Sequence, residues 1–145
     1  PARTPRAERV AHRRRRDIGD TGGVSSAVPP GWPPSVPPAH TSGWEDRAVA
    51  WLLDHCPPDY RSYAGWRKNP IALAWLADRH IDGQVGAMRQ AYREARVGLG
   101  PHVTTEALSE IMANLEVEGL RLVAAKRSSS LLLEALQGKR FIPRL

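Results

Sequence analysis

Apolar residues recur at helical spacing along two long stretches in the second half of the chain. In the first stretch, steps of four and three alternate along one helix face, which produces a heptad-like seam that needs a facing helix. Asn69 is a good N-cap and Pro70 a good first residue for this helix, and Gly98 and Gly100 mark its end. The positions of the seam are Ala74, Asp78, Ile81, Val85, Met88, Tyr92, Ala95 and Leu99.

The second stretch predicts another long helix, with Thr104 or Thr105 as its N-cap and Gly138 as its C-terminal stop. Because only residues 98–103 separate the two stretches, we expect the helices to fold back on each other as a long antiparallel hairpin. Three consecutive serines, 128–130, could instead divide the second helix into two. Its apolar face carries Leu108, Ile111, Met112, Leu115, Leu122 and Val123.

Asp78 is a polar residue within the apolar seam of the first long helix. Its carboxylate could pair with a cation from the facing helix, or the apolar face could rotate at this point toward Trp75 and Leu76. We expect the rotation.

Shorter helices precede the two long ones. Ser42 and Glu45 match a capping box, and Pro57-Pro58 ends the helix that follows. Residues 59–68 predict one further short helix. The apolar face of the first helix carries Trp44, Ala48, Trp51, Leu52 and His55, and that of the second carries Tyr60, Tyr63 and Trp66. We expect these aromatic side chains to pack together, with Trp44, Trp51, Trp66 and Trp75 at the centre of a small all-α domain over residues 42–138.

Residues 1–41 predict a flexible arm that is rich in arginine and proline. Arg6, Arg9, Arg13 and Arg16 recur at helical spacing, but too few apolar residues lie opposite them to hold a helix without a partner. The Pro-rich stretch from 29 to 38 predicts a semi-extended tether that holds the arm away from the domain. Residues 139–145 form a basic C-terminal tail.

Positive charge is distributed unevenly along the chain. Of the formal net charge of +6, residues 1–42 contribute +4, from seven Arg against Glu8, Asp17 and Asp20. A basic arm on a nearly balanced body indicates a negative partner, which is DNA, RNA or an acidic protein surface.

Two sets of candidate binding residues follow from this charge pattern and from the interleaved aromatic residues near position 60. The candidate nucleic-acid-binding residues are Arg3, Arg6, Arg9, Arg13, Arg14, Arg15, Arg16, Arg61, Arg67 and Lys68. The candidate partner-binding residues are Arg89, Arg93, Arg96, Phe141 and Arg144.

Several classes of protein receive no support from the sequence. Cys56 is the only cysteine, so no intrachain disulfide can form, and a reducing, cytoplasmic location is the expectation. No apolar run approaches the ~20 residues of a membrane span. Residues 54–56 and the set Asp78, His80 and Asp82 contain acidic and imidazole groups without the spacing of a metal or catalytic motif. We therefore expect no cofactor, no metal and no enzymatic activity.

The function that fits these observations best is a non-enzymatic accessory protein of a nucleic-acid machine, such as a nucleoid, transcription or ribosome-associated factor. The alternative is an adaptor or assembly subunit of a larger protein complex, in which the arm is a tether. The long amphipathic helices also allow a homodimer in which two hairpins form a four-helix bundle. A small enzyme of unrecognised type is the remote alternative.

Overall fold

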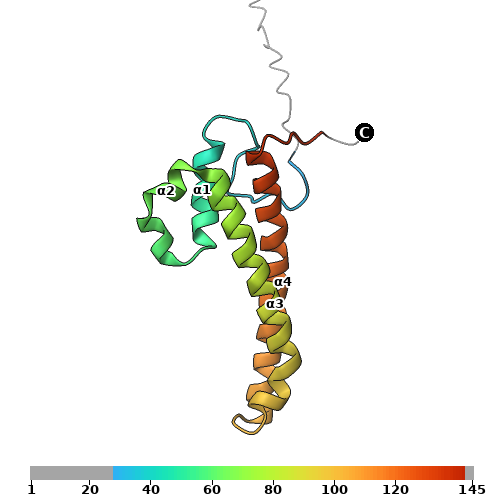
Figure 1. The fold of residues 1–145 in the computed structure, drawn as a ribbon. Coiled ribbons are helices and arrows are strands. Elements are labelled where there is room, and N and C mark those ends of the chain that lie inside the picture. The colour runs from blue at the N-terminus through green and yellow to red at the C-terminus, as the bar shows by residue number, and fades with distance from the viewer. Residues whose placement is uncertain (1–27, 143–145) are drawn as a thin grey trace, which may run out of the picture.

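The computed structural model describes residues 28–142, which contain four α-helices, one 3₁₀ helix and no strand (Figure 1). The expectation of an all-α fold is confirmed for these residues. The helices are α1 (Trp44–Asp54), the 3₁₀ helix η1 (Pro58–Ser62), α2 (Ala64–Lys68), α3 (Pro70–Leu99) and α4 (Thr105–Leu136).

The two longest helices, α3 and α4, have 30 and 32 residues and lie side by side in opposite directions (Figure 1). Pro70 is the first residue of α3, as predicted. Thr104 is the N-cap of α4, and its side-chain oxygen accepts a hydrogen bond from the Ala107 N–H at 3.1 Å. The helix ends just before Gly138, which has the left-handed backbone (φ 99) that a C-terminal stop requires.

The serine triplet does not divide α4, so the prediction of one long helix is confirmed and the alternative of two shorter helices is wrong. The helix is continuous through residues 128–130. The hydroxyls of Ser129 and Ser130 donate to the Asp78 carboxylate, and the hydroxyl of Ser128 donates to the Gly31 carbonyl. These hydroxyls bond mainly to groups outside α4, and only that of Ser129 also donates to a carbonyl of the helix, that of Lys126 at 3.0 Å, so the helix continues through the triplet.

The predicted capping box before α1 is also wrong. Gly43 is the N-cap, and no side chain caps the helix. The glycine has a left-handed backbone (φ 74), which turns the chain into the helix directly after a turn that Thr41 closes by donating its hydroxyl to the Pro38 carbonyl.

Residues 59–68 form two short helices, η1 and α2, rather than the one predicted. The Ser62 hydroxyl donates to the Asp59 carbonyl at 2.6 Å, and Tyr63 then has an extended backbone. This local hydrogen bond closes the 3₁₀ turn, so the backbone restarts as a new helix at Ala64.

The described part of the predicted arm, residues 28–41, contributes side chains to the hydrophobic core. Trp32 is 8% exposed and Val36 is 4% exposed, and the Trp32 indole N–H donates to the Val36 carbonyl at 3.0 Å. The prediction of a spacer is therefore wrong here. Burial of the Trp32 and Val36 side chains stabilises the folded state, and the neighbouring prolines reduce the conformational entropy that is lost when the segment is fixed. Residues 1–27 of the predicted arm lie outside the described residues.

The aromatic centre differs from the predicted set in one member. Trp75 is 48% exposed, and the Arg79 guanidinium lies over its ring at 3.5 Å from the centroid. Trp32 occupies the centre instead, with its ring centroid 6.2 Å from that of Trp44. Trp32 was not predicted at this centre, because its proline-rich surroundings indicated a segment outside the domain.

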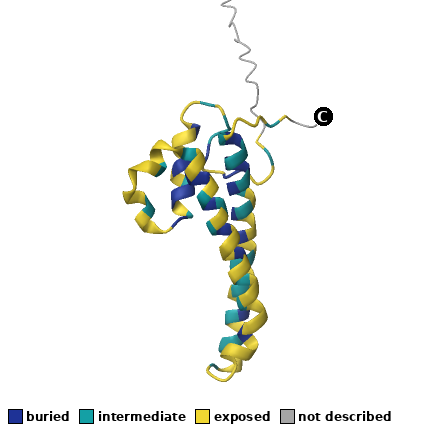
Figure 2. Cartoon of the chain, in the orientation of Figure 1, coloured by how far each residue is buried: buried dark blue, intermediate teal, exposed yellow. Residues whose placement is uncertain are grey.

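The structure divides into a head and a stalk. The head comprises residues 28–81 and 122–142, where the Pro-rich segment and α1 pack against the start of α3 and the end of α4. The stalk comprises residues 82–121, where only α3 and α4 are present, and most of its surface is exposed (Figure 2). None of the described helices has an apolar stretch long enough to cross a membrane.

Candidate interaction surfaces

A polar network joins the two long helices at the junction of head and stalk. Asp78 of α3 accepts hydrogen bonds through both carboxylate oxygens: Oδ2 from the Lys126 ammonium at 2.7 Å, and Oδ1 from the hydroxyls of Ser129 at 2.6 Å and Ser130 at 2.9 Å. The side chain of Asp78 is 15% exposed and that of Lys126 is 32% exposed. All three of these hydrogen-bond donors to the Asp78 carboxylate belong to α4.

The expected rotation of the α3 seam at Asp78 is therefore wrong, and the other alternative, pairing with a cation from the facing helix, is correct. Burial raises the pKa of Asp78, but the hydrogen bonds from Lys126 and the two serines outweigh burial and hold the pKa below its usual value. The ionised carboxylate, which accepts hydrogen bonds through both oxygens, links the two helices.

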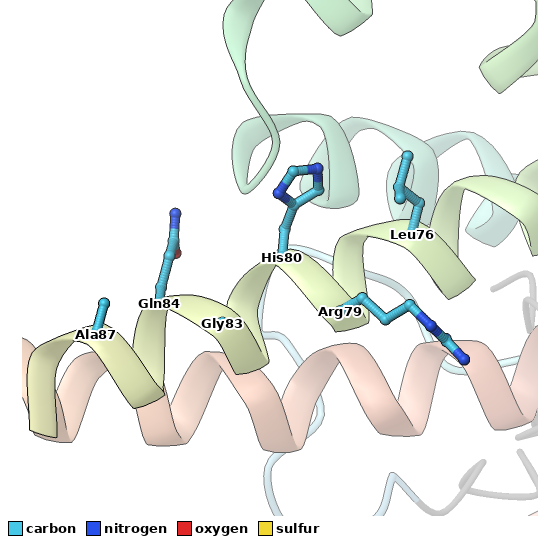
Figure 3. Close-up of a pocket in the computed structure, with 6 residues that line it drawn as sticks. All are labelled: Leu76, Arg79, His80, Gly83, Gln84 and Ala87. Carbon is cyan, nitrogen blue, oxygen red and sulfur yellow. The ribbon is translucent and has the colours of Figure 1, made fainter. Parts of the chain in front are cut away.

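A shallow depression of about 390 Å³ lies on α3 beside His80 (Figure 3). His80 and Gln84 stand on the same side of the helix, while Arg79 points away from them. The imidazole Nε2 lies 3.0 Å from the Tyr60 hydroxyl. Asp78 faces α4, so the sequence cluster of Asp78, His80 and Asp82 does not come together as an acid–base set. The lining residues are Leu76, Arg79, His80, Gly83, Gln84 and Ala87.

The second sequence cluster, residues 54–56, is also used within the fold. Asp54 pairs with Arg61, and the His55 ring stacks on Trp51 with 3.8 Å between centroids. Burial raises the pKa of the Cys56 thiol more than the charge of Arg61 lowers it, which disfavours the thiolate. Among residues 28–142, no three His, Cys, Asp or Glu side chains are placed to hold a metal ion.

The candidate nucleic-acid-binding residues fall into three groups. Arg61 is engaged inside the head, because besides its ion pair with Asp54 it donates to the Leu53 carbonyl at 3.4 Å. Arg67 and Lys68 are exposed at the end of α2. The remaining seven arginines, between positions 3 and 16, lie outside the described residues.

The aromatic residues between these cations are turned mainly toward the protein. Tyr60 and Trp66 stack with 5.6 Å between centroids and an interplanar angle of 12°, and both pack partly buried against the core. Tyr63 is 55% exposed. The expected packing of this trio holds for two of its three members.

The candidate partner-binding arginines lie on the stalk. Arg89, Arg93 and Arg96 are exposed on α3, and none of them forms an ion pair within the described part of the chain. Arg89 and Arg93 border a groove of about 410 Å³ between α3 and α4, whose opposite wall includes Glu116 and Gly119. This basic edge, between residues 89 and 96 of α3, is exposed.

The two candidates at the C-terminus differ from that picture. Phe141 packs edge-on against Trp32, with 5.9 Å between centroids, so its ring is held within the head rather than offered to a partner. Its assignment as a partner-binding residue is therefore not supported by its position. Arg144 lies outside the described residues.

One apolar surface was missed by the sequence analysis. Val117 and Leu120 of α4 are 68% and 69% exposed, on the side of the helix opposite Leu115 and Leu122, which face α3. We call the outward row formed by Ala113, Val117, Leu120 and Ala124 the outer seam. The steps of four, three and four residues between these positions are visible in the sequence. They were overlooked because the same helix has a second apolar face, which packs against α3.

Comparison with protein-family models, with curated proteins and with solved structures found no match to this chain. The surfaces described above are therefore the basis for assigning a function.

Proposed function

We propose that this chain is a non-enzymatic accessory protein of a nucleic-acid machine, such as a nucleoid, transcription or ribosome-associated factor. Its arginine-rich start binds a polyanion, and its helical domain binds protein or folded nucleic acid. The observation that carries the proposal is the position of the charge. Residues 1–16 contain seven Arg and one Glu, a sum of +6, which equals the formal net charge of the whole chain.

The attachment of the Pro-rich segment, which follows these arginines in the chain, supports the proposal. Pro30 accepts a hydrogen bond from the Arg127 side chain at 3.4 Å, and Gly31 accepts one from the Ser128 hydroxyl at 2.6 Å. These contacts anchor the chain at the junction of head and stalk. Residues 17–28, fully extended, span up to about 40 Å, so the arginines can reach a phosphate backbone beside the domain.

The test is a salt titration of binding to a labelled DNA duplex and to a single-stranded RNA, followed by fluorescence anisotropy. We expect the affinity of the full chain to fall steeply with salt. Replacing Arg13, Arg14, Arg15 and Arg16 together by Gln should reduce the slope of log K against log salt by about 3 to 4, because each phosphate contact contributes about 0.9.

The matched control replaces the same four arginines by Lys, which keeps the charge. This variant should retain the steep slope, because phosphate neutralisation does not depend on which cation supplies the charge. Binding that does not respond to salt, or no binding by the full chain, contradicts the proposal.

The exposed apolar side chains of the stalk favour a second candidate function, a protein adaptor. A two-helix stalk that presents Val97, Val117 and Leu120 to solvent has the character of a docking element. Purification from native extract with and without nuclease separates the two functions. Partners that remain attached after digestion support the adaptor, and partners that leave with the nucleic acid support the first function.

A further inference from the structure

The outward face of α4 is covered in the head and open in the stalk. Beyond Arg127, the chain's own Pro-rich segment lies over α4, with the Ser128 hydroxyl bonded to Gly31 and with Leu131 only 4% exposed. Between Glu110 and Arg127, no described part of the chain covers this face, and Val117 is 68% exposed. An exposed apolar row at heptad spacing is the pattern that packs against another helix.

The positions along this open face of α4 are arranged symmetrically, so that the face can pair with an identical face that runs in the opposite direction. Spaces of three, four, three, four and three residues separate its successive positions, so the order is the same in both directions. The side chains are also matched by size, since two alanines flank a valine and a leucine. The ends carry opposite charges. In order, the positions are Glu110, Ala113, Val117, Leu120, Ala124 and Arg127.

A second copy packed antiparallel on this face meets complementary groups at every position. Val117 lies opposite the partner's Leu120, and Ala113 lies opposite the partner's Ala124. Glu110 lies opposite the partner's Arg127, and the two-fold axis repeats each pair. A parallel copy would instead place Glu110 against Glu110 and Arg127 against Arg127, which is repulsive.

Both charged ends are available for such a contact. The Glu110 side chain has no hydrogen bond or ion pair with any residue between 28 and 142. Arg127 lies with its carbon chain against Gly31 and donates only its Nε to the Pro30 carbonyl. Its two terminal nitrogens form no hydrogen bond or ion pair with the described part of the chain, so they are placed to donate to a carboxylate of a second chain.

We propose that the outer seam of α4, extended by Glu110 and Arg127, is the interface of an antiparallel homodimer. In this register the tip of the partner's stalk lies level with the Pro-rich segment of the first copy. Helices packed in this way cross at about 20°. The tip lies ~25 Å from the centre of the seam along the helix. This crossing angle therefore displaces the tip of the partner's stalk by about 8 Å from the axis of α4 in the first copy.

The first test measures self-association of the full chain by sedimentation and light scattering over a concentration series. The wild-type chain should have twice the mass of its 16.0 kDa monomer. Val117→Asp places a carboxylate at the centre of the seam in each copy, so the dimer Kd should rise at least about 100-fold. Val97→Asp is the matched control, since Val97 is 83% exposed on α3 near the tip and outside the seam.

The second test determines the direction of packing. Glu110→Arg and Arg127→Glu should each raise the Kd about 10-fold or more, and the double reversal should restore it. Because Arg127 also contacts Pro30, cysteine cross-linking in a Cys56→Ala background provides a measurement that does not alter this arginine. A chain with Ala113→Cys and Ala124→Cys should form disulfide-linked dimers, whereas Ala113→Cys alone should not.

Several results overturn the proposal: a monomeric wild-type chain, equal effects of the two valine variants, or a double reversal that stays dissociated while cross-links form between like positions. If residues 1–27 of the same chain covered the seam, only a chain beginning at residue 28 would dimerise. If a different protein covered it, the purified chain would remain monomeric. Neither outcome depends on polyanion binding, so failure here leaves the proposed function to its own test.

Discussion

Head and stalk are built from the same two long helices but have different surroundings. In the head, each long helix is also covered by α1 or by the Pro-rich segment, and side chains from several elements become inaccessible to solvent. In the stalk, each long helix has only the other as a neighbour among residues 28–142. The fully buried side chains of the head include Leu52, Leu73, Ile81 and Leu132, whereas the most buried side chains of the stalk, Val85, Ala95 and Met112, keep 7% of their surface exposed.

This difference indicates that the head and the stalk have different roles. A layer of two helices can bury only the faces that meet, so every other face of the stalk is exposed to solvent or to a partner. The head supplies stability that the stalk alone lacks, and the stalk supplies the accessible surface. The basic edge at Arg89 and Arg93 and most of the apolar outer seam lie on the stalk, and the seam ends at Ala124 at the start of the head.

Truncation of core side chains should reveal the difference most strongly. Leu132→Ala removes a fully buried side chain of the head and should lower the free energy of unfolding by about 3 to 4 kcal/mol. Met112→Ala in the stalk should cost about 1 to 2 kcal/mol, because its site borders solvent and can relax. Urea denaturation followed by circular dichroism measures both. Equal costs at the two positions would show that the stalk is packed as tightly as the head.

The Pro-rich segment can be tested by a pair of tryptophans. Trp32→Ala should lower the free energy of unfolding by about 3 kcal/mol, because it removes an indole that is 8% exposed and that contacts Trp44 and Phe141. Trp75→Ala is the matched control, and its half-exposed ring should cost less than about 1 kcal/mol. Similar losses for both variants would mean that the segment does not stabilise the head.

Much of the fold follows from local signals in the sequence. Pro70 and Thr104 at helix starts and Gly138 after a helix end act through backbone constraints that each residue carries with it, and these boundaries were predicted correctly. The role of Trp32 could not be predicted in this way. Its burial depends on contacts with Trp44 and Phe141, which are distant in sequence.

The candidate surfaces were predictable only in part. Charge identified Arg89, Arg93 and Arg96 as an exposed set, since a helix face without apolar residues faces solvent. The interleaving of cations with aromatic residues also selected Arg61, which pairs with Asp54 in the fold. The sequence gives no means of separating a free arginine from a paired one when the pair depends on a turn, here η1, that brings the two residues together.

Asp78 lies where head and stalk meet. Its replacement should lower the free energy of unfolding by less than Leu132→Ala or Trp32→Ala. Asp78→Asn keeps the shape and part of the hydrogen bonding but leaves Lys126 without its counter-charge, so the free energy of unfolding at pH 7 should fall by about 1 to 2 kcal/mol. The stabilisation is modest because both side chains keep some exposure.

The pH dependence of the stability that Asp78→Asn loses identifies the cause of the loss. Because the folded pKa of Asp78 is lower than the unfolded value of about 3.9, the stabilisation by its carboxylate is fully present above the unfolded pKa and is lost as the pH falls through the folded pKa. The difference between wild type and Asp78→Asn should therefore be constant above about pH 5 and shrink in more acidic solution. Asp82→Asn, which removes the same charge at an exposed position one turn along α3, should stay within about 0.5 kcal/mol of wild type at pH 7. A difference between wild type and Asp78→Asn that does not change with pH would show that shape, rather than the ion pair with Lys126, joins the two helices.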